Sequence, residues 1–175
     1  MKRALMFCGV FCAMMIGVAA VSAQKGANFA GTWELDKGKS QLPQMMADRL
    51  QGATWTITQD DKQISREQKL DMAEGGGGGR RGMMGSGGSL TVKLDGSETT
   101  AETQRGKSTS KAKWLNDGKT IEINTVSNFS TPNGDFTSTT VEHWELADDG
   151  KTLKVHRKSE SPRGTNESTW VFTKK

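Results

Sequence analysis

The chain has 175 residues and a formal net charge of +4, from 24 basic and 20 acidic residues. The excess of positive over negative charges is small, and the two kinds are interspersed along the chain. This pattern excludes a protein built to bind nucleic acid. Both cysteines, Cys8 and Cys12, lie near the N-terminus. The rest of the chain therefore has no thiol for a disulfide, a nucleophile or a metal site.

The first 23 residues have the features of a signal peptide. Two basic residues open an apolar run that continues to Ala20, and Val21-Ser22-Ala23 gives the small-x-small pattern of a cleavage site. We expect residues 1–23 to be removed and residues 24–175 to form one exported domain, in the periplasm or outside the cell. No later apolar run approaches the ~20 residues of a membrane helix, so we expect no integral membrane segment.

The expected domain opens with a strand over residues 29–36, where apolar and polar side chains alternate in Phe29-Ala30-Gly31-Thr32-Trp33-Glu34-Leu35-Asp36. A helix is expected over residues 43–51. Pro43 suits its first turn, Gly52 follows its end, and an i, i+4 apolar stripe runs along it. Further on, the glycine content of residues 73–88 predicts a flexible loop.

Turn signals then recur at short intervals between runs rich in Thr, Val, Ile and Trp. They predict an antiparallel meander, in which each turn fixes the residues that face each other. The turns are Asp60-Asp61, Asp95-Gly96, Arg105-Gly106, Asp117-Gly118, Asn133-Gly134 and residues 147–150. The expected pairs are Ile57–Ile64, Val92–Thr99, Ala101–Ser110, Trp114–Ile121, Ile123–Trp144 and Trp144–Leu153. All of them place apolar or small residues on one common face.

With a last strand over residues 166–173, the pattern predicts an all-β, antiparallel up-and-down meander of about 8–10 strands with one short helix after the first strand. An open meander leaves two exposed edges, whereas closure into a barrel removes them and gives the single apolar face a core. A flat two-layer sandwich is the alternative.

The opening Phe29-x-Gly31-Thr32-Trp33-x-Leu35, the short helix and the Trp- and Thr-rich meander resemble the calycin superfamily of lipocalins and fatty-acid-binding proteins. The resemblance covers most of residues 28–174. It is closer to small exported bacterial lipocalin-like proteins that begin with Phe-x-Gly-x-Trp-x-Leu-Asp and continue to Lys39-Ser40. It implies a barrel with a cavity for a small hydrophobic or amphiphilic molecule, no catalytic step, and Trp33 as a packing residue.

Two differences between this sequence and the family narrow the range of expected ligands. The chain contains no tyrosine, so the Arg-x-Tyr anchor that fatty-acid-binding proteins use for a carboxylate is absent. It also lacks the second glycine of Gly-x-Trp-x-Gly and a histidine near its C-terminus, which disfavours the haem-binding barrels related to this group. We therefore expect no cofactor.

Polar residues on the expected inner face are the candidates for binding, because burial of a charge requires a partner or a ligand. In one interpretation, Arg157 or Arg66 binds an acidic head group while tryptophans line the apolar part. In the other, Glu142 pairs with Arg157, and Arg66 lies along the Trp55 ring with its guanidinium in water. The candidate ligand-binding residues are Arg66, Gln68, Glu142, Arg157, Trp55, Trp114 and Trp144.

The sequence gives little support for a metal site or a catalytic site. His143 and His156 are expected on the outer face near Glu145, but two imidazoles without a third ligand make a poor metal site. Neither histidine adjoins a serine with an inward acid, so no catalytic set is formed. We expect a monomeric, non-catalytic barrel that binds a small lipophilic or amphiphilic ligand. The alternative is an envelope structural or interaction protein whose barrel is filled by its own side chains.

Overall fold

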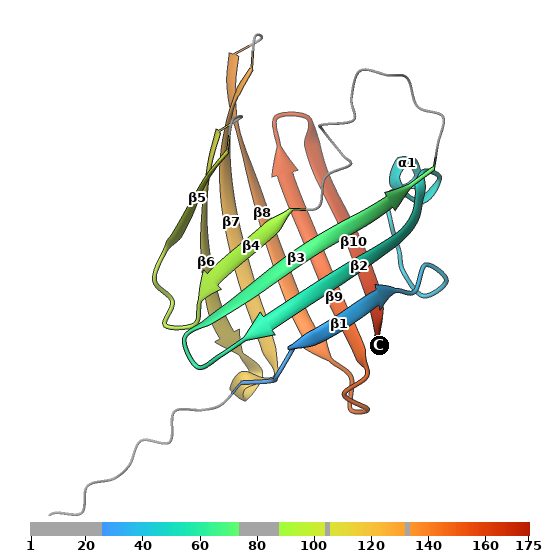
Figure 1. Ribbon diagram of the computed structural model, residues 1–175. Helices are drawn as coiled ribbons and strands as arrows, with labels where there is room; N and C mark the ends of the chain where they lie inside the picture. The colour runs from blue at the N-terminus through green and yellow to red at the C-terminus, as the bar shows by residue number, and fades with distance from the viewer. Residues whose placement is uncertain (1–25, 74–87, 104–105, 132–133) are drawn as a thin grey trace, which may run out of the picture.

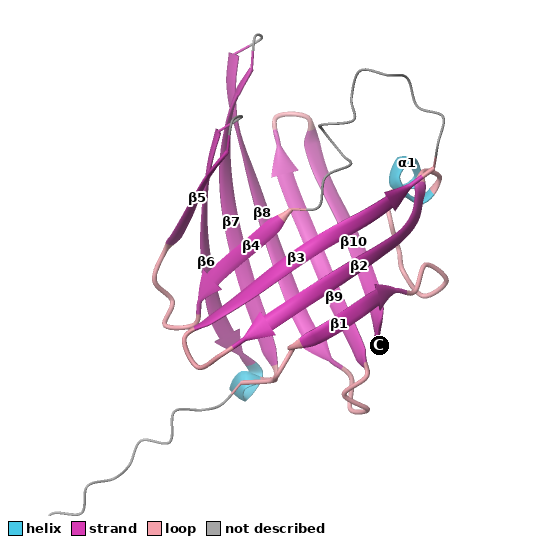
Figure 2. Ribbon diagram, viewed as in Figure 1, coloured by secondary structure: helices cyan, strands magenta, loops and turns pink. Residues whose placement is uncertain are grey.

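The computed structural model describes residues 26–73, 88–103, 106–131 and 134–175. The expected signal peptide and nearly all of the glycine-rich segment lie outside these ranges. Strands make up most of the described chain, with helix confined to two short segments (Figure 2). The elements are β1 (Gly31–Leu35), α1 (Gln44–Ala47), β2 (Leu50–Gln59), β3 (Gln63–Met72), β4 (Ser89–Lys93), β5 (Thr99–Thr103), β6 (Gly106–Leu115), the 3-10 turn η1 (Asn116–Gly118), β7 (Thr120–Thr131), β8 (Gly134–Leu146), β9 (Thr152–Ser161) and β10 (Gly164–Lys174).

Within the described residues, ten strands form one antiparallel sheet in the order β4-β3-β2-β1-β10-β9-β8-β7-β6-β5. The first and last strands of the chain pair, with Trp33 opposite Lys174. This pairing curls the sheet into a nearly closed barrel (Figure 1). The predicted all-β meander and its barrel are confirmed, and the sandwich alternative is wrong.

The barrel is open at one seam, between β4 and β5. These strands are consecutive in the chain but lie at opposite ends of the sheet order, and β4 approaches β6 across the seam without a ladder. The expected hairpin at Asp95-Gly96, with Val92 opposite Thr99, is therefore wrong. The Asp95 carboxylate accepts the backbone N–H and the hydroxyl of Ser97 at 2.8 and 2.6 Å. The polar groups that signalled a hairpin are thus satisfied within the loop.

Of the other five turns, the one at Asp117-Gly118 has the predicted register. The remaining four are shifted by two residues, which keeps every side chain on its predicted face. The observed pairs are Trp114–Ile121 as expected, and Ile57–Arg66, Ala101–Ser108, Ile121–Trp144 and Trp144–Val155 in place of Ile57–Ile64, Ala101–Ser110, Ile123–Trp144 and Trp144–Leu153. The inner face was therefore predictable even where the individual pairs were not.

Two of these shifts arise from glycines that follow the turn instead of forming it. Gly106 and Gly134 are the first residues of β6 and β8, with φ of +150° and +109°. A Cβ on Gly106 would lie 1.8 Å from the backbone oxygen of Asn128. Gly106 is thus required by the close approach of β6 to β7.

The other two shifts arise at aspartates whose carboxylates form hydrogen bonds within the turn. The Asp60 carboxylate accepts the backbone N–H groups of Lys62 and Gln63 at 2.7 and 2.8 Å. Asp149 accepts those of the second and third residues after it in the same way. Each turn keeps its expected number of residues but is centred one residue later than expected.

The helix α1 is a single turn, shorter than the predicted helix over residues 43–51. Leu50 belongs to β2, where its side chain is buried and lies opposite Met72. Leu42 and Met46 pack against the edge of the core. Burial of Leu50 at the start of a strand therefore outweighs its helical spacing. No helix in the described part of the chain has the length and apolar character to cross a membrane.

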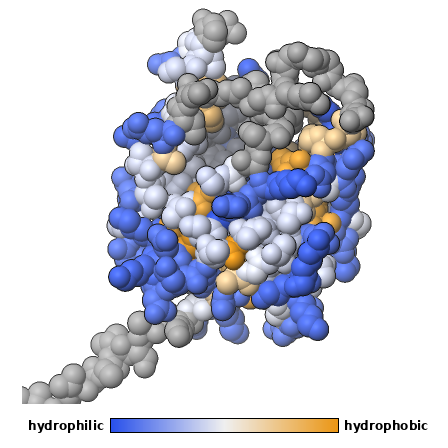
Figure 3. Space-filling view, viewed as in Figure 1, coloured by the Kyte–Doolittle hydropathy of each residue, from blue (hydrophilic) through white to orange (hydrophobic). Residues whose placement is uncertain are grey.

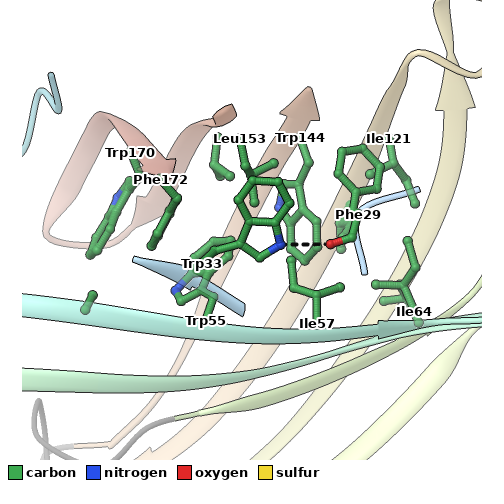
Figure 4. Close-up of a cluster of buried hydrophobic side chains, with 14 of the residues drawn as sticks. Phe29, Trp33, Trp55, Ile57, Ile64, Ile121, Trp144, Leu153, Trp170 and Phe172 are labelled. Atoms are coloured by element: carbon green, nitrogen blue, oxygen red, sulfur yellow. Dashed lines mark hydrogen bonds between the residues drawn. The ribbon is translucent and has the colours of Figure 1, made fainter. Parts of the chain in front are cut away.

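One end of the barrel is closed by the segment that precedes β1. The Ala27 N–H donates to the backbone oxygen of Gly118 at 2.7 Å. Phe29 is fully buried, and its carbonyl accepts the indole N–H of Trp33 at 2.8 Å (Figure 4). Trp33 is itself fully buried, as expected of a packing residue. On the face shown in Figure 3, the outer surface is in contrast mainly hydrophilic.

The role of Gly106 can be tested against Gly134, which occupies the same place after its turn but has no atom within 4 Å of an added Cβ. Both alanine substitutions strain a positive φ, but only Gly106→Ala also clashes with a backbone carbonyl. We expect Gly106→Ala to lower the free energy of unfolding by about 2 kcal/mol more than Gly134→Ala, measured by urea denaturation. Equal losses would contradict the close approach of β6 to β7.

Candidate functional site

The inner face of the barrel has two chemically different halves. The aromatic half lies toward the closed end and consists of Phe29, Trp33, Trp55, Trp144, Trp170 and Phe172. The hydroxyl half lies toward the other end, on β6 to β9, and consists of Ser108, Ser110, Thr125, Ser127, Thr140 and Ser159. Strand alternation places both sets on one face, because each hydroxyl residue is an even number of positions from a core residue of its strand.

The aromatic half is packed by its own rings. Trp55 lies 4.4 Å from Phe172 and 5.4 Å from Trp144, measured between ring centroids. Trp170 stacks on Phe172 at 6.1 Å with an angle of 10° between the ring planes. These side chains are at most 3% exposed. They point toward one another in Figure 4, so this half serves as core.

In the hydroxyl half, side chains bond to one another across neighbouring strands. The oxygens of Ser110 and Thr125 lie 2.9 Å apart, and those of Thr140 and Ser159 lie 3.1 Å apart. Ser108 and Ser127 form a third such pair at 2.8 Å. Each hydroxyl offers one donor and two acceptor positions, so a single bond per pair leaves hydrogen-bonding capacity unused.

Between the two halves lies an ion cluster of Arg66, Glu142 and Arg157. Glu142 on β8 is directly opposite Arg157 on β9, one step closer than the diagonal position expected from the sequence. Arg66 Nη1 donates to Glu142 Oε2 at 2.9 Å, and Arg157 Nε lies 3.7 Å from Glu142 Oε1. The cluster brings three of the predicted site residues together.

The Glu142 carboxyl is buried, with its side chain 7% exposed. Burial by itself raises its pKa, but the charges of Arg66 and Arg157 lower it, as do the hydrogen bonds from Trp144 and Arg66. The net effect holds the pKa of Glu142 below its ordinary value. The indole Nε1 of Trp144 donates to the same oxygen as Arg66, at 2.9 Å. Glu142 is therefore a fixed anion within the barrel.

The two arginines differ in the exposure of their side chains and in their contacts. The Arg66 side chain is 12% exposed, and its guanidinium lies 4.4 Å from the Trp55 ring centroid and 5.6 Å from that of Trp144. It lies over Trp55, as one interpretation expected, but it is buried against Glu142 and not placed in water. The Arg157 side chain is 39% exposed and has the longer contact with Glu142. Arg157 is thus the cation that an incoming molecule can reach.

The remaining predicted site residues have other partners. Gln68 lies opposite Trp55, and its Oε1 accepts the indole N–H of that residue at 2.9 Å. Trp114 stacks on Phe29 at the closed end, with 6.1 Å between ring centroids. The structure therefore places Gln68 and Trp55 beside the ion cluster, and the partly buried Trp114 against the core beneath it.

His143 and His156 lie directly opposite each other on the outer face, with their rings aimed at different neighbours. His143 Nε2 is 2.9 Å from Glu122 Oε2, and His156 Nδ1 is 3.4 Å from Thr169 Oγ1. Within the described residues, no group of three or more metal-ligating side chains is assembled. The histidine pair therefore lacks the convergent geometry of a metal site.

The sequence-based site prediction missed the hydroxyl half, because it counted residues such as Ser110 only as small residues on the inner face. A signal was present, because Ser108-x-Ser110, Thr125-x-Ser127 and Ser138-x-Thr140 alternate in phase with the apolar residues of the same strands. Period-two alternation that changes from apolar to hydroxyl within a strand indicates a change of environment along the inner face.

No protein-family model and no curated protein sequence matches the chain. Among solved structures, the chain is similar to the zebrafish ileal bile acid-binding protein complexed with cholic acid, with a TM-score of 0.53 and 15% sequence identity. The similarity covers 84% of this chain and 98% of that chain. It shows that this chain has the same antiparallel β-barrel fold as that protein, which is the fold that the sequence resemblance implied.

The unequal roles within the ion cluster can be tested by neutralising its members. Glu142→Gln leaves the buried Arg66 guanidinium without a counter-charge, and we expect it to lower the free energy of unfolding by about 3–5 kcal/mol at pH 7. Arg157→Gln removes a longer contact at a more exposed side chain, and we expect it to cost less than about 1 kcal/mol. Chemical denaturation measures both values, and equal losses would contradict this division.

The pH dependence of the free energy of unfolding supplies a control for Glu142→Gln. Because folding lowers the pKa of Glu142, its contribution to stability is present above its ordinary value of 4.5 and is lost as the pH falls through the folded value. The stability difference between the wild type and Glu142→Gln should therefore shrink on acidification below that value. A difference that stays constant down to pH 2–3 would show that Glu142 is not a native anion.

Proposed function

We propose that this chain is an exported, non-catalytic barrel protein that binds a small amphiphilic anion in the hydroxyl half. The observation that carries this proposal is the position of Arg157 at the floor of that half. The ion cluster contains two guanidinium groups and one carboxylate, so it keeps a positive charge after internal pairing. A carboxylate or similar group placed against Arg157 neutralises that charge through bidentate hydrogen bonds.

The comparison with the bile acid-binding protein supports a ligand-binding barrel in general. That structure was solved with cholic acid, which combines a carboxylate with a largely apolar body. In this chain the aromatic half is filled by its own rings, so the proposal places the ligand above the ion cluster. A molecule that places an anionic group on Arg157 and its remainder toward the barrel opening fits this arrangement.

The absence of catalysis and the monomeric state are parts of the same proposal. Glu142 is held as an anion by two arginines and an indole, which does not suit it to exchange a proton near neutral pH. Within the described part of the chain, Met45 is the only large hydrophobic residue that is mostly exposed, at 72%. A mainly polar outer surface of this kind favours a monomer over an obligate oligomer.

A second candidate is an interaction protein with no small-molecule ligand. The closely packed aromatic half favours it, because that half stabilises the barrel without a ligand. A groove of about 490 Å³ on the outer face of β6 and β7, where Lys111 and Asn124 lie, offers a place for a partner. Loss of the charge of Arg157 would leave such a function intact.

The role of Arg157 can be tested with cholate as the probe. We expect Arg157→Gln to weaken cholate binding about tenfold or more, because a hydrogen-bonded charge pair contributes roughly 1.5–3 kcal/mol. Arg163→Gln, which changes an exposed arginine in the turn between β9 and β10, is the matched control. Isothermal titration calorimetry measures the affinities and thermal unfolding confirms the fold. Unchanged affinity in Arg157→Gln would reject this site.

Export can be tested separately by the mass of the protein recovered from its own cells. Cleavage after Ala23 predicts a chain that begins at Gln24 and is found in the periplasm or the medium. An intact N-terminus in a cytoplasmic fraction would reject the export proposal and leave the binding proposal untouched.

A further inference from the structure

The hydroxyl half forms a wall directly above the ion cluster. Thr140 lies two residues before Glu142 on β8, and Ser159 lies two residues after Arg157 on β9. The hydrogen-bonded Thr140–Ser159 pair is therefore about 7 Å along the strands from the Glu142–Arg157 pair, which is the rise of two strand residues. A molecule whose anionic group contacts Arg157 places its next atoms against these hydroxyls.

The wall continues over the neighbouring strands. The Ser110–Thr125 and Ser108–Ser127 pairs extend it across β6 and β7. Ser110 is 5% exposed, so its hydroxyl is not simply a surface group. At the edge of the same face, the Thr99 hydroxyl on β5 is buried and has no hydrogen-bond partner among the residues that the structure describes.

Such a wall discriminates between kinds of ligand. Each hydroxyl-to-hydroxyl pair keeps about one donor and several acceptor positions available. Covering them with methylene groups leaves those positions unmatched, at a cost of about 1–3 kcal/mol for each group. A ligand with its own hydroxyl groups replaces the lost hydrogen bonds and avoids this cost.

Building on the proposed function, we propose that the ligand is a polyhydroxylated anion, such as an acidic sugar or an amphiphile with an acidic sugar head group. Its anionic group contacts Arg157 and its hydroxyl groups contact the wall formed by Thr140, Ser159, Ser110 and Thr125. An unsubstituted fatty acid satisfies Arg157 but leaves the wall unmatched. The hydroxyl half therefore selects ligands that carry hydroxyl groups, while Arg157 selects ligands that carry a negative charge.

The test uses four probes with an eight-carbon chain, at concentrations where each is monomeric. Octyl glucuronide carries both an anionic group and hydroxyls, octanoate carries only the anion, octyl glucoside carries mainly hydroxyls, and octanol carries a single hydroxyl without charge. We expect octyl glucuronide to bind at least about tenfold more tightly than octanoate, the effect of roughly two additional hydrogen bonds. Free glucuronate, tested alongside, distinguishes a sugar acid from a glycolipid head group as the source of this chemistry.

The variant for this test is the double substitution Thr140→Val and Ser159→Ala. Replacing both partners of a hydrogen bond with apolar groups of similar shape is nearly neutral for stability, so the barrel is expected to stay folded. The matched control is Ser65→Ala with Thr91→Val, which removes a 2.9 Å hydroxyl pair from the outer face of β3 and β4. We expect only the inner variant to lose the preference for octyl glucuronide over octanoate.

The outcomes separate this inference from the proposed function. If octanoate and octyl glucuronide bind equally and both depend on Arg157, the proposed function stands and the specificity inference is wrong. If the inner variant keeps the full preference for octyl glucuronide, the wall is not its source and the inference is also wrong. If neither anion binds, both proposals fail.

Discussion

The burial of the Glu142 carboxylate is the constraint on which the arrangement of the barrel depends. A carboxylate with a side chain only 7% exposed needs partners that outweigh its desolvation. Arg66 reaches it from β3 and Arg157 from β9, so the cluster joins strands on opposite sides of the barrel. The same carboxylate orients Trp144, whose ring contacts Trp55 at 5.4 Å. The ion cluster and the aromatic half are thus one cooperative unit.

This unit also determines where the proposed ligand would bind. Below the cluster, rings occupy the inside of the barrel, and Phe29 with the segment before β1 closes the end. Above it, the inner positions nearest the cluster carry serine and threonine, and the stacked Phe129–Phe136 pair, 5.0 Å between ring centroids, lies further out on β7 and β8. Arg66 is held by Glu142 and two indoles, so its charge serves the structure. Arg157 lies at the boundary between the two halves, where it contacts Glu142 next to the hydroxyl half.

The sequence predicted the fold well because the inner face follows from side-chain alternation, which tolerates errors in register. The sequence-based prediction of individual residue pairs was wrong where the role of a residue could not be inferred from its type. Gly106 was interpreted as a turn residue, yet its position is required by the approach of Asn128. Asp95 was interpreted as a hairpin signal, yet its carboxylate closes a loop at the seam. The Arg66–Glu142 contact spans 76 residues between strands that do not pair, so no local pattern encodes it.

The fold alone does not determine the ligand, and the energetics of the inner face show why. Burying a methylene group gains about 0.8 kcal/mol, whereas leaving a buried hydroxyl unmatched costs about 1–3 kcal/mol. A fatty acyl chain laid along Thr140, Ser159 and their neighbours therefore gains little or nothing from burial. The same barrel with apolar residues at these positions favours that chain strongly. A few hydroxyl groups on β6 to β9 are enough to reverse the preference, and at 15% identity such positions are not shared with a structural neighbour by default.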